Sequence, residues 1–299
     1  MFIPYKVDVP MQRWPLANWA LIAVICIASI AVWLNPDEHA WRALALHRGE
    51  WFHPLGLLTS TFVHADIFHL AGNMFFLFLF GNALNARLGH WQFLALYFLA
   101  GLFSDLAWVA FGSSHVYFMG LDLGIGDVAS IGASGAIMGI VGMFLILYPR
   151  NNISVYWGIS VWYGGTFELS AYWIIALYVA FDIWGLLHGT AGIGYLAHVA
   201  GATFGIAAMA ALVKYNWVAP FKGEENLLQV FGFKPKLDDL PTTRSTSTAW
   251  SAVSRQYLID GHDRTTGFKT SFTTSAHSES EARLKAQQEQ LVVDRIQVL

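Results

Sequence analysis

The sequence of 299 residues has little charge and almost no cysteine. Only 12% of the residues are charged and 56% are apolar, proportions that a soluble protein of this length does not reach. The low charge therefore excludes a soluble enzyme and indicates a chain that crosses a membrane several times. The single cysteine, Cys26, lies in the first apolar segment, so neither an internal disulfide nor a cysteine-based metal site can form.

The charge that is present is distributed unevenly. Residues 1–213 hold 6 Lys or Arg and 10 Asp or Glu, whereas residues 214–299 hold 11 and 10. We therefore expect a membrane domain over residues 1–213 and a polar, partly ordered C-terminal tail over residues 214–299. Within the tail, residues 241–254 are typical of a solvated Ser/Thr linker, and residues 278–297 of a short charged helix.

Six apolar segments are long enough to cross the hydrocarbon core of a bilayer, which takes about 20 helical residues. They cover residues 17–34, 66–86, 91–112, 131–148, 169–187 and 192–213. The predicted fold class is an all-α polytopic membrane protein with six transmembrane helices. The first loop contains Trp41, Trp51 and Phe52 beside two arginines, which is typical of an element lying in the membrane interface.

Basic residues indicate the orientation of these spans. If six spans alternate, Arg42 and Arg48 fall on one side and six basic residues fall on the other. The six are Lys6, Arg13, Arg87, Arg150, Lys214 and Lys222. Because Lys and Arg are enriched in cytoplasmic loops, we expect a cytoplasmic N-terminus and tail, in a bacterial inner membrane. No small-residue cleavage site clearly follows the first span, which we interpret as a retained anchor.

A serine and a histidine open the fourth and sixth spans. Ser134 lies in a Gly-Ala-Ser-Gly run, and at about 1.5 Å per helical residue it lies about 22 Å above the cytoplasmic end of its span. His198 lies about 24 Å above the same level, and Asn73 and His69 of the second span about 21 and 27 Å. Three parallel spans therefore bring polar side chains to one depth.

Small residues allow the fourth and sixth spans to approach closely. Gly135 and Gly139 form a small-xxx-small pair on the fourth span, and Gly201 and Gly205 form another on the sixth. The second pair shares a helix face with His198. A serine and a histidine within hydrogen-bond reach form a base-activated nucleophile, although a packed histidine bonded to a serine is the structural alternative.

His69 and Asn73 are four residues apart and share a helix face. The asparagine amide donates hydrogen bonds, which a developing oxyanion needs. Together with the backbone around Ser134 they could form an oxyanion hole; alternatively they only tie helices together. His64 and His69 are poorly spaced for a metal, with no third ligand nearby.

These motifs resemble the signature of rhomboid intramembrane serine proteases over roughly residues 50–213. The resemblance rests on His64-x4-His69-x3-Asn73, on Gly-x-Ser-Gly at 132–135, and on Ala-His-Val-Ala-Gly at 197–201 with Gly205. Each motif alone is weak, but three in order on the second, fourth and sixth spans are specific.

The resemblance implies a six-helix rhomboid bundle and a Ser-His dyad, with Ser134 as nucleophile and His198 as base and then acid. It also implies an oxyanion site from His69, Asn73 and the Ser134 backbone. The expected partners are single-pass membrane-protein substrates and the lipid bilayer, with no nucleic acid, no metal and no cofactor. Structural positions near the site are Gly132, Gly135, Met138, Gly201, Gly205 and His64, and Met138 replaces an aromatic residue that many family members have.

Asp105 and Asp182 lie well inside predicted spans, where an ionisable side chain is costly. Either could serve a proton relay or complete a triad, but neither falls in a matched motif, so we favour buried hydrogen-bonding or helix-end roles. Two other functions are a catalytically silent binder of membrane clients and a proton-coupled transporter. The first typically lacks the serine or histidine retained here, and the second should show internal repeats.

Overall fold

The computed structural model of the protein separates into two compact units, Met1–Pro241 and Thr242–Leu299. The residues that the structure describes are 2–9, 11, 13–35, 37–47, 54–112, 115–118, 121–125, 129–160, 163–188, 194–218, 225–233, 255–263, 268–276, 282, 285–286 and 291–298. Each unit is described by itself.

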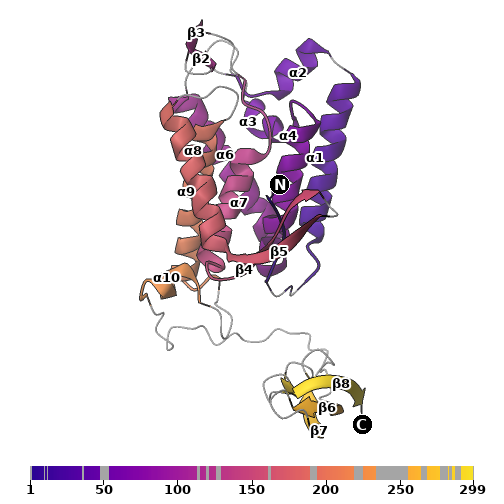
Figure 1. Ribbon diagram of the computed structural model, residues 1–299. Coiled ribbons are helices and arrows are strands. Elements are labelled where there is room, and N and C mark those ends of the chain that lie inside the picture. Colours follow the sequence, from indigo (N-terminus) through magenta and orange to yellow (C-terminus); the bar gives the residue numbers. More distant parts are fainter. Residues whose placement is uncertain are drawn as a thin grey trace. The chain divides into compact units, whose positions relative to one another are not determined.

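The first unit is a bundle of apolar helices (Figure 1). Its long helical segments are α1 (Leu16–Leu34), the continuous α4 (Ile67–Phe76), η3 (Leu77–Gly81) and α5 (Asn82–Leu88), then α6 (His90–Phe111), α7 (Ser134–Leu147), α8 (Ala171–His188) and α9 (Tyr195–Lys214). Five of the described segments are long and apolar enough to cross a membrane, and α7 is apolar but has only 14 residues. The predicted all-α polytopic membrane fold is confirmed, with five full-length candidate spans and one shorter helix.

Helix α7 forms the centre of the bundle. Twelve of its 14 residues are buried, as expected for a helix that is apolar all round and enclosed by others. At about 1.5 Å per residue α7 is about 21 Å long, shorter than the hydrocarbon core of about 30 Å. A helix of this length that ends at one membrane boundary begins inside the bilayer, and Ser134 is the first residue of α7.

Helices α7 and α9 pack backbone to backbone, as the glycine spacing predicts. A Cβ on Gly201 would collide with the carbonyl oxygen of Gly135, and a Cβ on Gly205 would collide with that of Gly139. One turn further on, a Cβ on Gly142 would lie 2.5 Å from the carbonyl oxygen of Ala202. The closeness of the two helices therefore depends on the absence of side chains along this line.

A buried asparagine joins α1 to the second span. The Asn18 amide donates to the carbonyl of Leu77 at 2.9 Å and to Oδ1 of Asn82 at 2.8 Å. Its backbone N–H donates to Oδ1 of Asn85 at 3.1 Å. Leu77 opens the π-helical stretch η3, where the wider turn releases a carbonyl from the α-helical ladder. Asn18 satisfies that carbonyl and holds the two helices in register.

A three-stranded antiparallel sheet, which the sequence analysis did not expect, lies across the bundle (Figure 1). Its order is β1 (Phe2–Val7), β4 (Asn152–Ser160) and β5 (Tyr163–Ser170), with Phe2 opposite Trp157 and Asn152 opposite Ser170. The β4–β5 hairpin follows α7 and leads directly into α8. Consequently the segment before the fifth span is a strand, and the helix begins at Ala171.

Short elements connect the long helices. They are α2 (Glu38–Leu44), α3 (Gly56–Thr59) and η2 (Ser60–Phe62) in the first loop, the paired strands β2 (His115–Phe118) and β3 (Leu121–Ile125) in the third, and α10 (Leu227–Val230) after α9. Trp51, Phe52 and Arg48 of the predicted interfacial element lie outside the described residues, as does the linker at 241–254. The side chains of Arg150 and Glu225 form an ion pair that attaches the segment before α10 to the end of α7.

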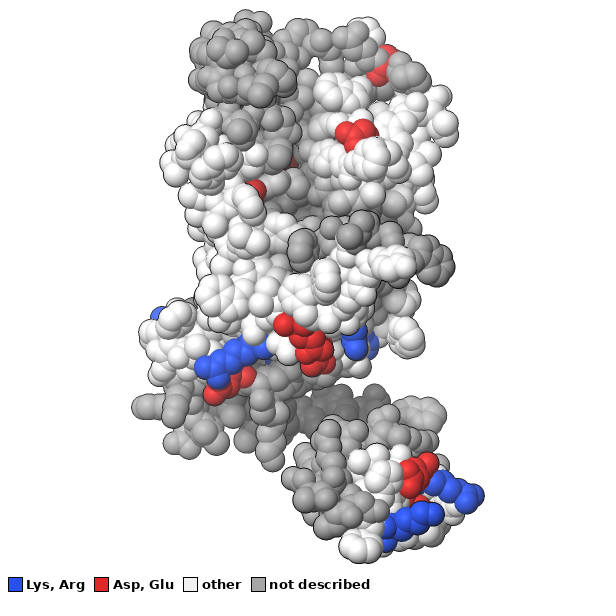
Figure 2. Space-filling model, in the orientation of Figure 1, with Lys and Arg blue, Asp and Glu red and all other residues white. Residues whose placement is uncertain are grey.

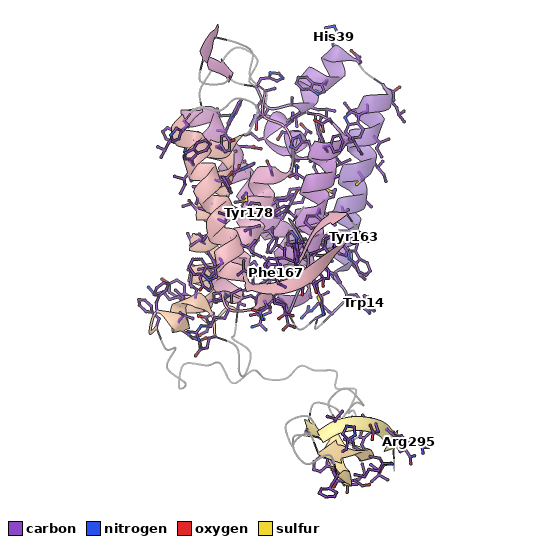
Figure 3. The ribbon with its side chains drawn as sticks, viewed as in Figure 1. Trp14, His39, Tyr163, Phe167, Tyr178 and Arg295 are labelled. Carbon is purple, nitrogen blue, oxygen red and sulfur yellow. The ribbon has the colours of Figure 1, made fainter. Side chains whose placement is uncertain are left out.

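Charged and aromatic side chains mark one end of the first unit. On the face seen in Figure 2 the described Lys and Arg side chains of this unit gather at one end, whereas the other half shows acidic side chains but no basic ones. Exposed aromatic side chains lie in the same half of the bundle: Trp14 is 72% exposed, Tyr163 79% and Phe167 39% (Figure 3). Aromatic residues flanked by basic ones are typical of a membrane–water interface.

The second unit contains an antiparallel sheet in the order β7-β6-β8, formed by β6 (Arg255–Asp263), β7 (Lys269–Ala276) and β8 (Leu291–Val298). The helix predicted over residues 278–297 is therefore wrong from Leu291 onward. The β-branched residues there favour a strand, and pairing with β6 brings Val293 and Ile296 against the small core around Ile259.

Candidate active site

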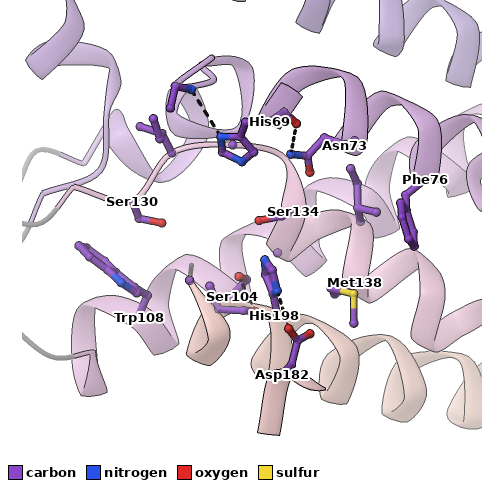
Figure 4. Close-up of a pocket in the computed structure, with 18 of the residues that line it drawn as sticks. His69, Asn73, Phe76, Ser104, Trp108, Ser130, Ser134, Met138, Asp182 and His198 are labelled. Carbon is purple, nitrogen blue, oxygen red and sulfur yellow. Dashed lines mark hydrogen bonds and ion pairs between the residues drawn. The ribbon is translucent and has the colours of Figure 1, made fainter. Parts of the chain in front are cut away.

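A cavity of about 710 Å³ lies between α4, α6, α7, α8 and α9 (Figure 4). The residues from the predicted site that line it are Ser134, His198, His69, Asn73, Gly132, Gly135 and Met138. Ser134 lies between the His69 side and the His198 side of this cavity (Figure 4). His64, Gly201 and Gly205 are not in the lining; they lie behind it.

Ser134 begins α7 after a tightly constrained turn. Gly132 has a φ of +104°, a conformation that L side chains rarely adopt, and a Cβ there would lie 2.8 Å from Nε2 of His69. The N–H of Gly132 donates to the carbonyl of Ser60 at 2.9 Å. Because the first N–H groups of a helix have no partner within it, the N–H of Ser134 points out of the helix end. Within the described residues no hydrogen-bond partner is found for it.

His198 lies in the first turn of α9, where its N–H donates to the carbonyl of Gly194 at 3.0 Å. Its ring Nδ1 lies 3.1 Å from Oδ1 of Asp182 on α8. A carboxylate acceptor at Nδ1 favours the tautomer with the proton on that nitrogen, leaving the lone pair on Nε2. No hydrogen bond joins Ser134 to His198, both of which are described, although both line the one cavity.

His69 and Asn73 occupy the opposite wall, on α4. Asp66 caps this helix by accepting from the N–H groups of Phe68 at 2.8 Å and His69 at 2.9 Å. Both hydrogen bonds, chiefly the one from the His69 N–H, hold the pKa of the Asp66 carboxyl below its usual range. The N–H of Ala65 donates to Nδ1 of His69 at 3.4 Å, so the ring proton belongs on Nε2.

The amide group of Asn73 donates one hydrogen bond among the described residues. Its Nδ2 donates to the carbonyl of His69 at 2.9 Å, which occupies one of the two amide hydrogens. His69 Nε2–H, the second Asn73 hydrogen and the Ser134 N–H are therefore three donors beside the same cavity. Such a set suits an oxygen atom that becomes negatively charged during a reaction.

His64 supports the Ser134 turn from behind. It is 1% exposed, its Nε2 lies 3.4 Å from the N–H of Ala133, and its Nδ1 lies 3.0 Å from Oγ of Ser29. The Ser29 hydroxyl donates onward to the carbonyl of Phe62 at 3.0 Å, so it accepts from His64 Nδ1. Burial, and secondarily the neighbouring His69, lowers the pKa of His64 to about 4.

Two further contacts hold the α7 and α9 ends of the cavity. Oγ of Ser104 on α6 donates to the carbonyl of Ala197 at 2.8 Å and occupies the space that a Gly135 side chain would need. Met138 is 8% exposed and lies on the wall that also carries Asp182 and His198 (Figure 4). Its thioether fills the position for which the resemblance implies an aromatic ring.

The two intramembrane aspartates are both in the cavity wall. Asp105 accepts from Oγ of Ser60 at 3.2 Å, a buried hydrogen-bonding arrangement of the kind that the sequence favoured. Asp182 instead faces His198, which sequence reasoning did not favour. The sequence signal for a role of Asp182 was its position inside a predicted span. The relative orientation of α8 and α9, which brings Asp182 to His198, cannot be derived from the sequence of either helix alone.

Other lining residues also escaped the sequence analysis. Tyr178, Phe76 and Trp108 shape the apolar part of the cavity, and the Tyr178 and Phe76 rings meet edge to face at 4.9 Å. No motif identifies them because aromatic residues are common throughout these helices. Among the described residues, no three His, Cys, Asp or Glu side chains are grouped so that they could hold a metal ion.

Comparison with known proteins connects this geometry to a family. A family model described as Rhomboid domain matches residues 48–215. The human protein named Presenilin-associated rhomboid-like protein, mitochondrial, is 29% identical over 181 residues, which cover 58% of this chain and 41% of that protein. Rhomboid protein 1, mitochondrial, from Saccharomyces cerevisiae is 28% identical over 187 residues, covering 61% and 49%.

A bacterial relative is also similar. Putative rhomboid protease YdcA from Bacillus subtilis is 31% identical over 124 residues, which cover 42% of this chain and 54% of that protein. The chain thus spans between 41% and 54% of the length of these three relatives.

Proposed function

The chain belongs to the rhomboid family, and from that premise we propose that it is a serine endopeptidase that cleaves transmembrane segments of single-pass membrane proteins inside the bilayer. The observation that carries the proposal is that Ser134 and His198 line one cavity, opposite His69 and Asn73. A nucleophile, a base and hydrogen-bond donors on facing walls are what peptide hydrolysis requires.

In the proposed reaction Oγ of Ser134 attacks the carbonyl carbon of the scissile peptide, and the hydroxyl proton passes to Nε2 of His198. The imidazolium then gives that proton to the leaving amine nitrogen as the C–N bond breaks, leaving the acyl group on Ser134. A water molecule, deprotonated by His198 in turn, hydrolyses the ester and restores the serine.

The oxyanion formed in each step accepts hydrogen bonds from the N–H of Ser134, from Nε2–H of His69 and from the Asn73 amide. The first donor lies at the N-terminus of α7, where the aligned peptide dipoles favour negative charge. Removing one donor from such a site costs roughly 100-fold to 1000-fold in kcat.

The substrate enters a site that lies below one membrane boundary. Because α7 is about 9 Å shorter than the hydrocarbon core, Ser134 acts near one end of a substrate helix, which we assign to the external end from the Lys and Arg asymmetry. The N-terminus and tail are then cytoplasmic. Although two of the relatives carry mitochondrial names, we propose a bacterial inner (plasma) membrane from the likeness to the Bacillus subtilis protein. A substrate helix must unwind to expose its carbonyl, and Gly near the scissile bond weakens the helix. We expect Gly, Ala or Ser there to favour cleavage, because all three have small side chains.

The test is cleavage of a synthetic single-pass substrate by the purified protein in lipid vesicles. We expect cleavage near the external end of the substrate by the wild type and no detectable cleavage by Ser134→Ala or His198→Ala. Ser130→Ala is the matched control, because Ser130 lines the same cavity and its hydrogen bonds with Leu46 are formed by backbone atoms, which the substitution keeps. We expect it to retain activity within about threefold.

Two results contradict the proposal. Cleavage that survives either Ser134→Ala or His198→Ala removes the dyad. A wild type that binds but never cuts single-pass substrates identifies the chain as a silent binder of membrane clients.

A further inference from the structure

The side chains of Asp182 and His198 form a partly buried contact between α8 and α9. Asp182 lies about two turns before the end of α8, and its Oδ1 is 3.1 Å from Nδ1 of His198. The two side chains are 13% and 16% exposed. Within the described part of the chain, His198 is the one hydrogen-bond partner of the Asp182 side chain.

Helix α8 presents Asp182 to the bundle and not to lipid. Tyr178 and Gly185 lie four residues before and three residues after it, on the same helix face. Tyr178 lines the cavity, and a Cβ on Gly185 would collide with the ring of Tyr195. Asp182 therefore belongs to the face of α8 that contacts α9.

The same contact fixes the register between the two helices. Gly185 meets Tyr195 and Asp182 meets His198, so a step of three residues forward on α8 matches a step of three residues back on α9. This antiparallel register is set by ring packing at one point and by the hydrogen bond at the other. Glycine at 185 permits the approach that brings the carboxylate to the imidazole.

We propose that Asp182 is a positioning residue for His198. Nucleophile, base and carboxylate then follow one another in space, as Ser134 on α7, His198 on α9 and Asp182 on α8. The carboxylate accepts the Nδ1 proton, holds the ring in one orientation and leaves the Nε2 lone pair toward the cavity (Figure 4). It also stabilises the imidazolium while Nε2 carries the serine proton. This inference rests on the proposed function.

Asp105 provides a built-in comparison. It is a second carboxylate in the wall of the same cavity, and its described partner is Oγ of Ser60 rather than a histidine. Asp105→Asn replaces a carboxyl group in the cavity wall by an amide without changing the contacts of His198. The other titratable groups in the lining, Asp66, His69 and Tyr178, stay in place in both variants.

The experiment compares Asp182→Asn with Asp105→Asn in the full chain in lipid vesicles, measuring kcat, KM and the thermal unfolding midpoint. We expect Asp182→Asn to lower kcat by about 10-fold to 100-fold, with KM within about twofold and the unfolding midpoint unchanged. We expect Asp105→Asn to lower kcat by less than about threefold. Labelling of Ser134 by a fluorophosphonate should slow in parallel with kcat for Asp182→Asn, because the probe reports nucleophile activation without a peptide substrate.

If Asp182→Asn does not fold, a second matched pair of variants tests whether a carboxylate is needed at this position. Asp182→Glu and Asp182→Gln have the same shape and differ in charge, and we expect the glutamate variant to be at least tenfold faster. Equal rates for the two members of either comparison overturn the proposal. A kcat loss that follows a lowered unfolding midpoint also overturns it. Failure of the wild type to cleave would instead contradict the proposed function itself.

Discussion

At the scale of single residues, His64 is the clearest example of a side chain that acts through others. Its two ring nitrogens are both occupied, one by the N–H of Ala133 and one by Oγ of Ser29. The Nε2 atom accepts, so the neutral ring with its proton on Nδ1 fits both contacts. Protonation of Nε2 would replace the acceptor for Ala133 by a donor and disturb the turn that leads to Ser134.

This arrangement predicts how stability depends on pH. Burial lowers the pKa of His64 from 6.5 to about 4 in the folded protein. Because the unfolded chain binds the proton first, stability is complete above pH 6.5 and is lost as the pH falls towards 4. Between pH 7.5 and pH 5 this single group should cost ~2 kcal/mol of unfolding free energy, measured as a falling thermal midpoint in detergent.

The comparison that isolates His64 is His64→Gln, whose amide can accept from Ala133 and donate to Ser29 without titrating. Over the same pH range its midpoint should fall by clearly less than that of the wild type. Equal slopes for the two proteins would mean that the loss comes from titratable groups other than His64.

At the scale of elements, the α7–α9 interface decides whether the serine and the histidine share a cavity. A leucine at Gly201 would place a side chain where the carbonyl of Gly135 now lies. Overpacking of this kind typically costs 1–3 kcal/mol, and here it also moves α9 away from Ser134. We expect Gly201→Leu to lower the unfolding midpoint and to reduce cleavage at least about 100-fold, because a displacement of 1 Å can cost that much in rate.

Ala207 on the same helix provides the control, because it is exposed on the outer surface of α9. Ala207→Leu adds the same apolar bulk without entering the interface, so its midpoint and cleavage rate should match those of the wild type. If both leucine variants lose activity alike, the loss reflects a general intolerance of α9 and the interpretation of the glycine contact is wrong.

The helices were predictable from the sequence, whereas the sheet was not. Apolar segments of the right length reveal a span from local composition alone, and the glycine spacing on α7 and α9 reveals which faces meet. Strand β1 pairs with β4 about 150 residues further along, and no local pattern encodes a partner at that distance. Likewise β8 was predicted as helix because its pairing with β6 is also remote in sequence.

At the scale of the whole molecule, the candidate site belongs to the first unit alone. The described residues that line the cavity run from Ala65 to His198, and the second unit starts at Thr242. The second unit has its own small core around Tyr257 and Ile259. None of the described residues that line the cavity belongs to this second unit.

Truncation tests this division. A chain that stops after Pro241 should cleave the single-pass substrate within about twofold of the full-chain rate, because every element that positions the site is retained. The measurement is the initial rate in vesicles at equal protein density. A fall of tenfold or more, with the unfolding midpoint of the first unit unchanged, would assign a role in activity to residues 242–299.

The candidate site was largely predictable because its residues lie at one depth on parallel helices. Ser134, His198, His69 and Asn73 follow from helical rise and from the face that each shares with small or polar neighbours. The contact of Asp182 with His198 did not follow, since it depends on the rotation of α8 about its own axis. That rotation is set by Gly185 and Tyr195, a packing relation that appears only in three dimensions.

The glycine contacts between α7 and α9 fix the spacing of Ser134 and His198 but place no constraint on the cavity walls formed by other helices. Where Gly201 meets Gly135 and Gly205 meets Gly139, two main chains touch and no side chain lies between them. Ser134 and His198 lie at the N-termini of these two helices. The distance between the N-termini is therefore set by main-chain contact and is kept in any sequence that keeps these glycines. Under the proposed function, substitutions in the cavity walls on α4, α6 and α8 change substrate preference while Ser134 and His198 keep their spacing.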